Sequence, residues 1–206
     1  MPEAHPRARP PAWRIRTERC ELRPWAVTDT AALASLHERN RDHLRPSMPW
    51  ADDSVDEDAV VARILRFHGC FARGEDYIYA ILHEGQVIGG TGLHPRVGPR
   101  ALEIGYWIDA PHEGRGLISE TTRALTRVAF RVHAVDRVEI RMDPGNVRSA
   151  TVPARLGFLH EVTLPRRFEG PAGLRDQMVW TRYAVGADTL EGPALEAWDV
   201  LGRRLV

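Results

Sequence analysis

Residues 101–129 read ALEIGYWIDAPHEGRGLISETTRALTRVA and place a strand pattern, a glycine turn and a helix pattern in direct succession. Apolar residues fall at every second position from 102 to 108, and a period of two predicts a strand. Pro111 ends that strand because proline has no N–H to give to a sheet ladder. From Ile118 onward apolar residues recur at helical spacing, and charged residues occupy the opposite face. The stretch therefore predicts a strand–turn–helix unit around which the rest of the chain is arranged.

The glycine turn at residues 114–116 is a candidate anion site. Gly114 and Gly116 have no Cβ, so the backbone can turn close to a ligand. The helix that follows presents unpaired N–H groups and the positive end of its dipole, which favours phosphate. The spacing matches neither GxGxxG nor GxxxxGK[ST], so neither a Rossmann site nor a P-loop is predicted. On this stretch alone, a glycine turn without a ligand is an equal alternative.

Composition limits the classes of protein to which the chain can belong. Its 206 residues predict one domain with a full core. The 28 basic and 28 acidic residues cancel, which argues against nucleic acid as the main partner. No signal peptide and no long apolar run is found, so a soluble, cytoplasmic protein without a membrane partner is predicted. The two cysteines and nine histidines have no metal-ligand spacing, and no metal is expected.

The element pattern divides the chain into three parts. Residues 1–12 are proline-rich and predict a disordered leader, residues 13–184 a single domain, and residues 185–206 an extension with an amphipathic helix at 190–205. Thr28 is predicted to cap the first helix, and Ser54 to Glu57 form a predicted capping box for the second. The predicted strands are 16–23, 77–83, 86–94, 102–108, 137–142, 158–166 and 174–183, and the predicted helices are 29–39, 57–73, 118–132 and 146–156.

This order, β-α-α-β-β-β-α-β-α-β-β, predicts a mixed α/β (α+β) fold. The sheet should be mostly antiparallel. Residues 101–142 form a strand–helix–strand crossover, so the strands at its two ends should be parallel, with the helix on one face.

The segment NRDHLRPSMPW at residues 40–50 predicts a loop that carries exposed apolar side chains. Such loops are often functional, although Met48 and Trp50 could equally pack on the core. Five acidic residues lie around the next helix start. Their negative charges interact favourably with the dipole at the helix start, and together they could also attract a cationic substrate. They are Asp52, Asp53, Asp56, Glu57 and Asp58.

Four strings in order carry a family resemblance. They are LRPW at 22–25, HLRPSMPW at 43–50, EIGYW at 103–107 with GRGLISE at 114–120, and a helix bearing Asn146, Ser149, Val152 and the Leu-Gly-Phe of 156–158. Together they resemble the GNAT superfamily of acyl-CoA-dependent N-acyltransferases, in particular its RimJ/RimL-like group, over residues 22–183. The resemblance implies a GNAT-like central sheet with helices on both faces.

Two positions depart from the pattern of that family. The phosphate signature Q/R-x-x-G-x-G/A has Glu113 at its first position here and Ile118 at its last. A glutamate beside a pyrophosphate should repel it unless the side chain points to solvent, and an isoleucine should crowd the turn. CoA binding is therefore expected, but weakened.

The resemblance also implies a site between the fourth and fifth strands of the domain, which splay apart around the pantetheine arm. It implies acetyl-CoA as co-substrate. The backbone of Trp107 and Ile108 would hold the arm together with Asn146, and Gly114, Arg115, Gly116, Ile118 and Ser119 would hold the phosphates.

For the chemistry, the resemblance implies that Glu103 acts as general base through water and that Ser149 gives a proton to the departing thiolate. Met48, Trp50 and His94 would contact the acceptor. The alternatives are a salt-bridged strand carboxylate for Glu103, a helix cap for Ser149, and a satisfied or exposed histidine for His94 and His112.

The acceptor is predicted to be an α-amino group of a peptide or protein. With a pKa of about 7.7–8 such a group is roughly one-tenth to one-fifth neutral at pH 7, whereas lysine at about 10.4 is neutral roughly once in 2,500. Acylation of a small amine, such as an antibiotic or a polyamine, is an alternative within enzymes. A non-catalytic acyl-CoA-binding module is the alternative outside them. A monomer or a homodimer would both fit.

Overall fold

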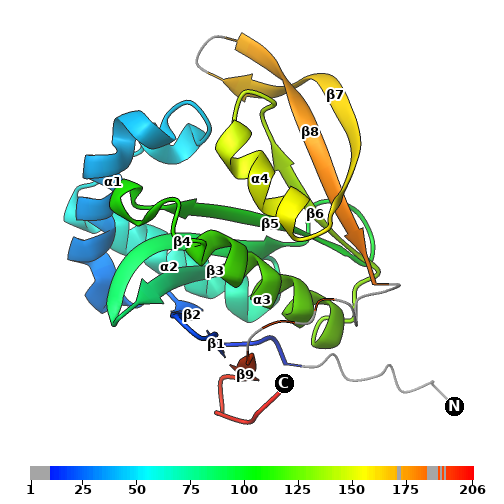
Figure 1. The fold of residues 1–206 in the computed structure, drawn as a ribbon. Helices are drawn as coiled ribbons and strands as arrows, with labels where there is room; N and C mark the ends of the chain where they lie inside the picture. The colour runs from blue at the N-terminus through cyan, green and yellow to red at the C-terminus, as the bar shows by residue number, and fades with distance from the viewer. Residues whose placement is uncertain (1–9, 171–172, 185–189, 191, 193) are drawn as a thin grey trace, which may run out of the picture.

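The computed structural model describes residues 10–170, 173–184, 190, 192 and 194–206, and in these residues the chain forms one mixed sheet with helices on both faces (Figure 1). The strands are β1 Arg14–Arg16, β2 Cys20–Pro24, β3 Tyr77–His83, β4 Gln86–His94, β5 Ala101–Ile108, β6 Arg137–Met142, β7 Leu159–Gly170, β8 Gly173–Tyr183 and β9 Glu196–Trp198.

The sheet order is β7-β8-β6-β5-β4-β3-β2-β1-β9, and every neighbouring pair is antiparallel except β5 and β6. The parallel pairing of β5 with β6 is confirmed, but it is confined to Ala101, Leu102 and Glu103 of β5. Beyond Glu103, β5 has no ladder partner in β6, so the two strands diverge. This divergence opens the middle of the sheet on the C-terminal side of Glu103.

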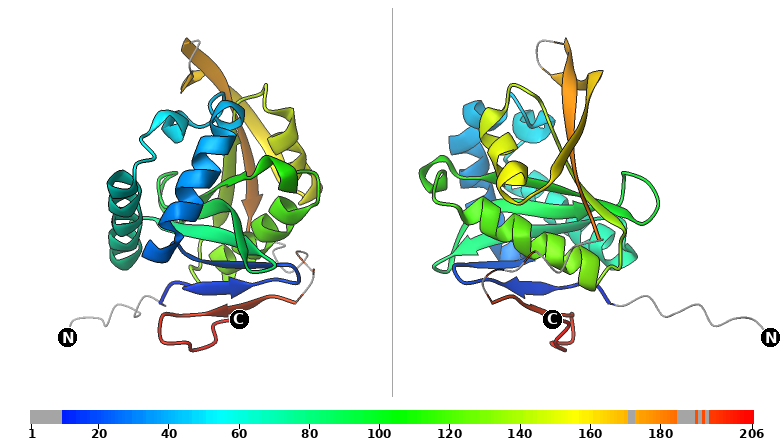
Figure 2. Two further views of the ribbon diagram at one scale, coloured as in Figure 1. Left: turned by 90° about the vertical axis from the view of Figure 1, so that its left-hand side faces the viewer. Right: turned by 45° about the vertical axis from the view of Figure 1, so that its right-hand side comes forward.

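Two helices cover each face (Figures 1 and 2). Helix α3, Leu117–Arg131, buries Leu125 and Val128 in the larger core with Ile104 of β5. Helix α4, Val147–Arg155, contacts α3, β6 and β7. Helices α1, Thr30–Leu44, and α2, Glu57–Arg73, form a second core with Trp107. Short 3-10 turns lie at Val27–Asp29, Pro49–Asp52 and Ala110–His112.

Both predicted helix caps were wrong. The residue before α1 is Asp29, not Thr28, and its carboxylate accepts from the Ala26 N–H and pairs with Arg23. For α2 the cap is Asp56, which accepts from the Ala59 N–H at 2.9 Å, while the Ser54 hydroxyl bonds to the Asp56 carboxylate. Aspartate is as good an N-cap as serine or threonine, so more than one residue near each helix start could serve as the cap. The sequence therefore did not show at which of these residues the helix begins. Helix α1 also extends to Leu44, into the predicted loop.

The predicted helix at 190–205 was wrong as well. Residues 196–198 form β9, which pairs with the open edge of β1. Leu195, Ala197 and Asp199 are buried and alternate with more exposed residues, a strand period that a helical pattern can mimic over a short stretch. The Arg14 guanidinium lies 4.5 Å from the Trp198 ring centroid and adds a cation–π contact. Residues 185–189, 191 and 193 of the predicted extension lie outside the described part.

The N-terminal end of the domain begins earlier than predicted. Ala12 is fully buried, and its carbonyl accepts from the Tyr79 hydroxyl at 2.7 Å, so this residue belongs to the core. Residues 1–9 of the predicted leader lie outside the described residues. The predicted first strand is divided into β1 and β2 by a turn at residues 17–19.

Candidate functional site

A cavity of about 550 Å³ lies where β5 and β6 diverge. Its walls come from four segments, which are the end of α1 with the loop after it, the end of β5, the glycine turn with the start of α3, and α4. They contribute His43, Leu44, Ser47, Met48, Tyr106, Trp107, Ile108, His112, Glu113, Gly114, Gly116, Leu117, Ile118, Ser119, Asn146, Arg148, Ser149, Thr151, Val152 and Arg155.

The cavity reaches both faces of the sheet. Tyr106 and Trp107 are consecutive strand residues, so their side chains point to opposite faces, and both line the cavity. Tyr106 lies on the side of α3 and α4, where its hydroxyl donates to the Ser149 carbonyl at 3.1 Å. Trp107 lies on the side of α1 and α2. Two reactants could therefore meet in the gap from opposite faces.

The glycine turn has the geometry of an anion site. Gly114 and Gly116 have φ of 70° and 78°, the left-handed region that only glycine adopts without strain. Gly116 is the N-cap of α3 and supplies no side-chain cap, so the N–H groups of the first turn of this 15-residue helix lack that partner. Ile118 lies in this first turn, lines the cavity and packs against the core.

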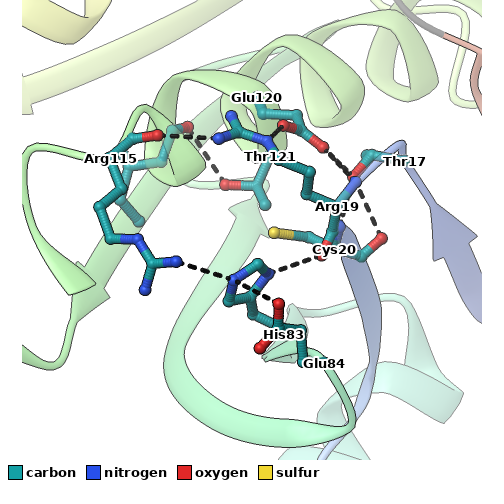
Figure 3. A network of polar contacts seen from close by, with 9 residues as sticks. Thr17, Arg19, Cys20, His83, Glu84, Arg115, Glu120 and Thr121 are labelled. Carbon is teal, nitrogen blue, oxygen red and sulfur yellow. Dashed lines mark hydrogen bonds and ion pairs between the residues drawn. The ribbon is translucent and has the colours of Figure 1, made fainter.

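A buried carboxylate on α3 holds the turn in place. Glu120 accepts from the Thr17 hydroxyl at 2.6 Å, the Arg19 N–H at 2.8 Å and the Arg19 side chain at 2.7 Å (Figure 3). The same arginine donates to the Arg115 carbonyl at 2.9 Å. Burial raises the pKa of Glu120, but these hydrogen bonds and the Arg19 charge outweigh it, and the pKa is lowered. These hydrogen bonds thus connect the turn between β1 and β2 to the glycine turn at residues 114–116.

The end of β5 is fixed from the other side. Buried Asp109 accepts from Arg39 at 3.0 and 2.5 Å and from the Asn40 amide at 2.7 Å, and the Asn40 carbonyl oxygen accepts from the Ala110 N–H at 3.0 Å. Burial raises the pKa of Asp109, but Arg39 and Asn40 lower it more. Helix α1 therefore positions the backbone just before the glycine turn.

Basic side chains line the mouth of the cavity, and Glu113 contacts two of them. Its carboxylate lies 2.7 Å from His43 Nε2 on α1 and 2.5 Å from Arg148 Nη1 on α4. Arg155 also lines the cavity, seven residues after Arg148 on the same face of α4. Neither arginine was among the predicted site residues, although their i, i+7 spacing could be seen in the sequence.

The α4 wall is organised by Asn146. Its side-chain oxygen accepts from the Ser149 N–H at 3.1 Å and so caps α4, and its amide donates to the Ser47 hydroxyl at 3.1 Å. Ser149 itself lines the cavity one turn into the helix. Tyr106, which was not a predicted site residue, connects this wall to β5.

The loop between α1 and α2 closes one side of the cavity. Met48 lines it, and Trp50 packs edge-on against Trp107 with ring centroids 5.5 Å apart. The acidic residues nearby are partly neutralised. Asp52 pairs with Arg45 at 3.2 Å, and Asp53 with Arg63 at 3.5 Å. The predicted negative surface is therefore weaker than the sequence suggested.

Four predicted site residues do not line the cavity, namely Trp50, which packs on Trp107, and Glu103, Arg115 and His94. Glu103 is held in a bidentate ion pair by Arg96, at 2.7 and 3.0 Å, with a side chain only 10% exposed. Arg115 directs its guanidinium toward His83 Nε2, 3.4 Å away (Figure 3). His94 lies on the face of β4 and β5 that Trp107 shares. The other predicted cofactor contacts, Trp107, Ile108, Gly114, Gly116, Ile118, Ser119 and Asn146, all line the cavity.

Among the described residues no three His, Cys, Asp or Glu side chains gather as metal ligands would. Within the same part of the chain, no helix has the length and apolar character needed to cross a membrane.

A mixed sheet parted between two parallel strands, with a glycine turn at a helix N-terminus beside the gap, offers space for an elongated ligand and a candidate anion site next to it. The chain belongs to the GNAT acetyltransferases, because residues 19–159 match the family model described as "Acetyltransferase (GNAT) domain". The predicted family and fold class are thereby confirmed, as is the prediction of a GNAT-type N-acetyltransferase.

Individual relatives agree with this assignment. YdaF of Bacillus subtilis (strain 168) is 31% identical over 147 residues, 70% of this chain and 80% of its own. The ribosomal-protein-serine acetyltransferase of Escherichia coli (strain K12) is 28% identical over 147 residues, 70% of this chain and 82% of its own. The structure of Mycobacterium smegmatis RimJ in complex with CoA-disulfide has a TM-score of 0.77 at 22% identity, covering 88% of this chain and 90% of that one.

Proposed function

We propose that the protein transfers an acetyl group from acetyl-CoA to the α-amino group of a peptide or protein N-terminus. The observation that carries this proposal is the cavity that passes through the sheet, since Tyr106 and Trp107 line it from opposite faces. The donor would enter beside α3 and α4, and the acceptor beside α1 and α2. The E. coli relative that is named for acetylating a ribosomal-protein serine supports this choice of acceptor.

The residues present fit acetyl-CoA. Gly114, Gly116 and the N–H groups that begin α3 would hold the pyrophosphate, with Arg148 and Arg155 nearby for negative charge. From residue 104 onward, the edge of β5 that faces β6 has no ladder partner, and its backbone groups would hold the pantetheine arm and stabilise the charge that develops on the thioester oxygen. Ser149 would donate a proton to the thiolate as it leaves.

Glu113 need not oppose the phosphates as the sequence suggested. Its carboxylate is already held by the Arg148 guanidinium and by the His43 imidazole. A bound phosphate would compete with Glu113 for these two partners, which lowers the net gain from binding without closing the site.

The test is release of CoA thiol from acetyl-CoA in the presence of peptides that begin with serine, alanine or methionine. The matched control is each peptide with a blocked N-terminus and a free lysine side chain. Transfer to the free α-amino group and not to the blocked peptide supports the proposal. Transfer only to spermidine or another small amine overturns the acceptor class, and tight CoA binding without any transfer overturns the enzymatic function.

A further inference from the structure

The imidazole of His94, the last residue of β4, lies over two glycines of neighbouring strands. A Cβ on Gly92 would come within 2.7 Å of His94 Cε1 and 2.8 Å of Nε2, and a Cβ on Gly105 would come within 3.1 Å of Nε2. Any other residue at position 92 would displace the ring. The glycines therefore make room for an imidazole that lies across β4 and β5, with Nε2 toward β5.

An acidic residue fixes the ring. Nδ1 of His94 is hydrogen-bonded to Asp76, which immediately precedes β3. A carboxylate at Nδ1 sets the orientation of the imidazole, and in the neutral ring it favours the tautomer that carries the proton on Nδ1 and the lone pair on Nε2. Among the described residues Nε2 makes no hydrogen bond of its own. The side chain of His94 is 14% exposed and that of Asp76 27%, so the pair remains accessible to a small group.

The ring occupies the acceptor face of the sheet. Gly105 and Trp107 lie two residues apart on β5 and share one face, and Trp107 lines the cavity on the side of α1 and α2. Nε2 covers Gly105, the residue just before the stretch of β5 that borders the cavity. His94 does not itself line the cavity, so a proton on an amine that enters the gap from this face would reach Nε2 through one intervening water.

Glu103, the base predicted from the sequence, is engaged in an ion pair. Glu103 stands opposite His94 in the β4–β5 register, and both of its oxygens accept from Arg96. Beyond it, Glu139 of β6 pairs with Arg137 and Arg141. The charged groups that face the imidazole are thus Asp76, which is in contact with it, and the Glu103–Arg96 ion pair opposite it. The carboxylate of Glu103 is therefore engaged by a cation, whereas Nε2 of His94 is not engaged.

We propose that His94 is the general base of the acetyl transfer and that Asp76 is its positioning residue. This inference rests on the proposed function. As the amine nitrogen bonds to the acyl carbon and the carbon–sulfur bond breaks, one amine proton passes through water to Nε2, and the thiolate takes a proton from the Ser149 hydroxyl. The imidazole then releases its proton to solvent and Ser149 regains one from solvent, so both side chains return to their starting states.

The test compares His94→Gln, Asp76→Asn and, as the matched control, His160→Gln, a histidine on β7 far along the sheet from β4. Turnover with the best amine of the wild-type panel should fall about 10²–10³-fold in His94→Gln and less in Asp76→Asn, with CoA affinity and melting temperature retained. The ratio of wild-type to His94→Gln rates should shrink as pH falls, because a protonated imidazole is no base. A purely structural role would leave that ratio constant.

Chemical rescue by added imidazole distinguishes the loss of a base from a folding defect. His94→Ala empties an imidazole-shaped space above Gly92 and Gly105, so added imidazole should restore part of its turnover but none of the deficit of Ser149→Ala. Full turnover in His94→Gln, or a ratio that does not vary with pH, overturns the inference while the proposed function stands. A wild-type chain that acetylates only spermidine overturns the acceptor class, and the same variants then test His94 with spermidine. A wild-type chain that acetylates no amine overturns both.

Discussion

The carboxylate of Glu113 lies 2.5 Å from Arg148 Nη1, and it thereby joins the turn before α3 to the face of α4 across the mouth of the cavity. Arg148 is 79% exposed, and Glu113 is 26% exposed. The ion pair is therefore formed by a solvent-exposed arginine that an incoming anion can reach. His43 holds the other oxygen of Glu113 from α1. An anion that enters the cavity must compete with Glu113 for both partners.

Replacing Glu113 should strengthen CoA binding. Glu113→Gln removes the competing charge and leaves Arg148 and His43 to the phosphates, so we expect an affinity gain of about 3–10-fold at low salt that shrinks as salt screens the charges. Calorimetric titration of CoA at two ionic strengths measures this. Glu75→Gln, which removes an equal charge from an exposed pair with Arg73, is the control and should change nothing. Weaker binding in Glu113→Gln would mean that the bridge organises the site.

Loss of Ser149 should slow the departure of the thiolate. Ser149→Ala is expected to lower turnover about 10²-fold with CoA affinity nearly unchanged, because a general acid acts on the rate and not on binding. An acyl donor with a better thiolate leaving group should recover part of the deficit. Tyr106→Phe is the comparison, since it removes the hydroxyl that donates to the Ser149 carbonyl but leaves the Ser149 side chain. Equal loss of stability and activity in Ser149→Ala would mean that the serine only stabilises helix α4 and donates no proton.

The strand and helix periods predicted the strand–turn–helix unit, and the family strings predicted part of the cavity wall, because backbone geometry there depends on local residues such as Gly114, Gly116 and Asn146. Side-chain contacts between segments that are distant in the sequence could not be predicted. Nothing near Glu103 in the sequence indicates that Arg96 neutralises it, and nothing near His94 indicates Asp76, 18 residues earlier. The C-terminal strand was missed for the same reason, since β9 depends on the open edge of β1 and not on its own propensity.

Glu103 should matter for stability and not for proton transfer. Glu103→Gln leaves Arg96 without its charged partner, and because this arginine is 61% exposed we expect a loss of only about 1 kcal/mol in the free energy of unfolding. Turnover should stay within about threefold of wild type, far less than the 10²–10⁴-fold effect of a lost base. Urea unfolding and initial rates measure the two quantities. A large rate deficit that shrinks as pH rises would restore Glu103 as the base.

Glu120 should make the protein sensitive to acid. The pKa of this carboxyl is lowered in the folded state, since the hydrogen bonds from Thr17 and Arg19 outweigh burial, so the unfolded chain binds its proton more readily. The resulting stability is fully present above the unfolded pKa of about 4.3 and is lost as pH falls through the lower, folded value. In Glu120→Gln, the free energy of unfolding should drop by about 1–3 kcal/mol at pH 7 and depend less on pH below about 5. Urea titrations at pH 7, 5 and 4 measure it, with Glu75→Gln as the exposed-pair control. If the wild type and Glu120→Gln lose stability in parallel between pH 5 and 4, Glu120 does not carry the acid sensitivity.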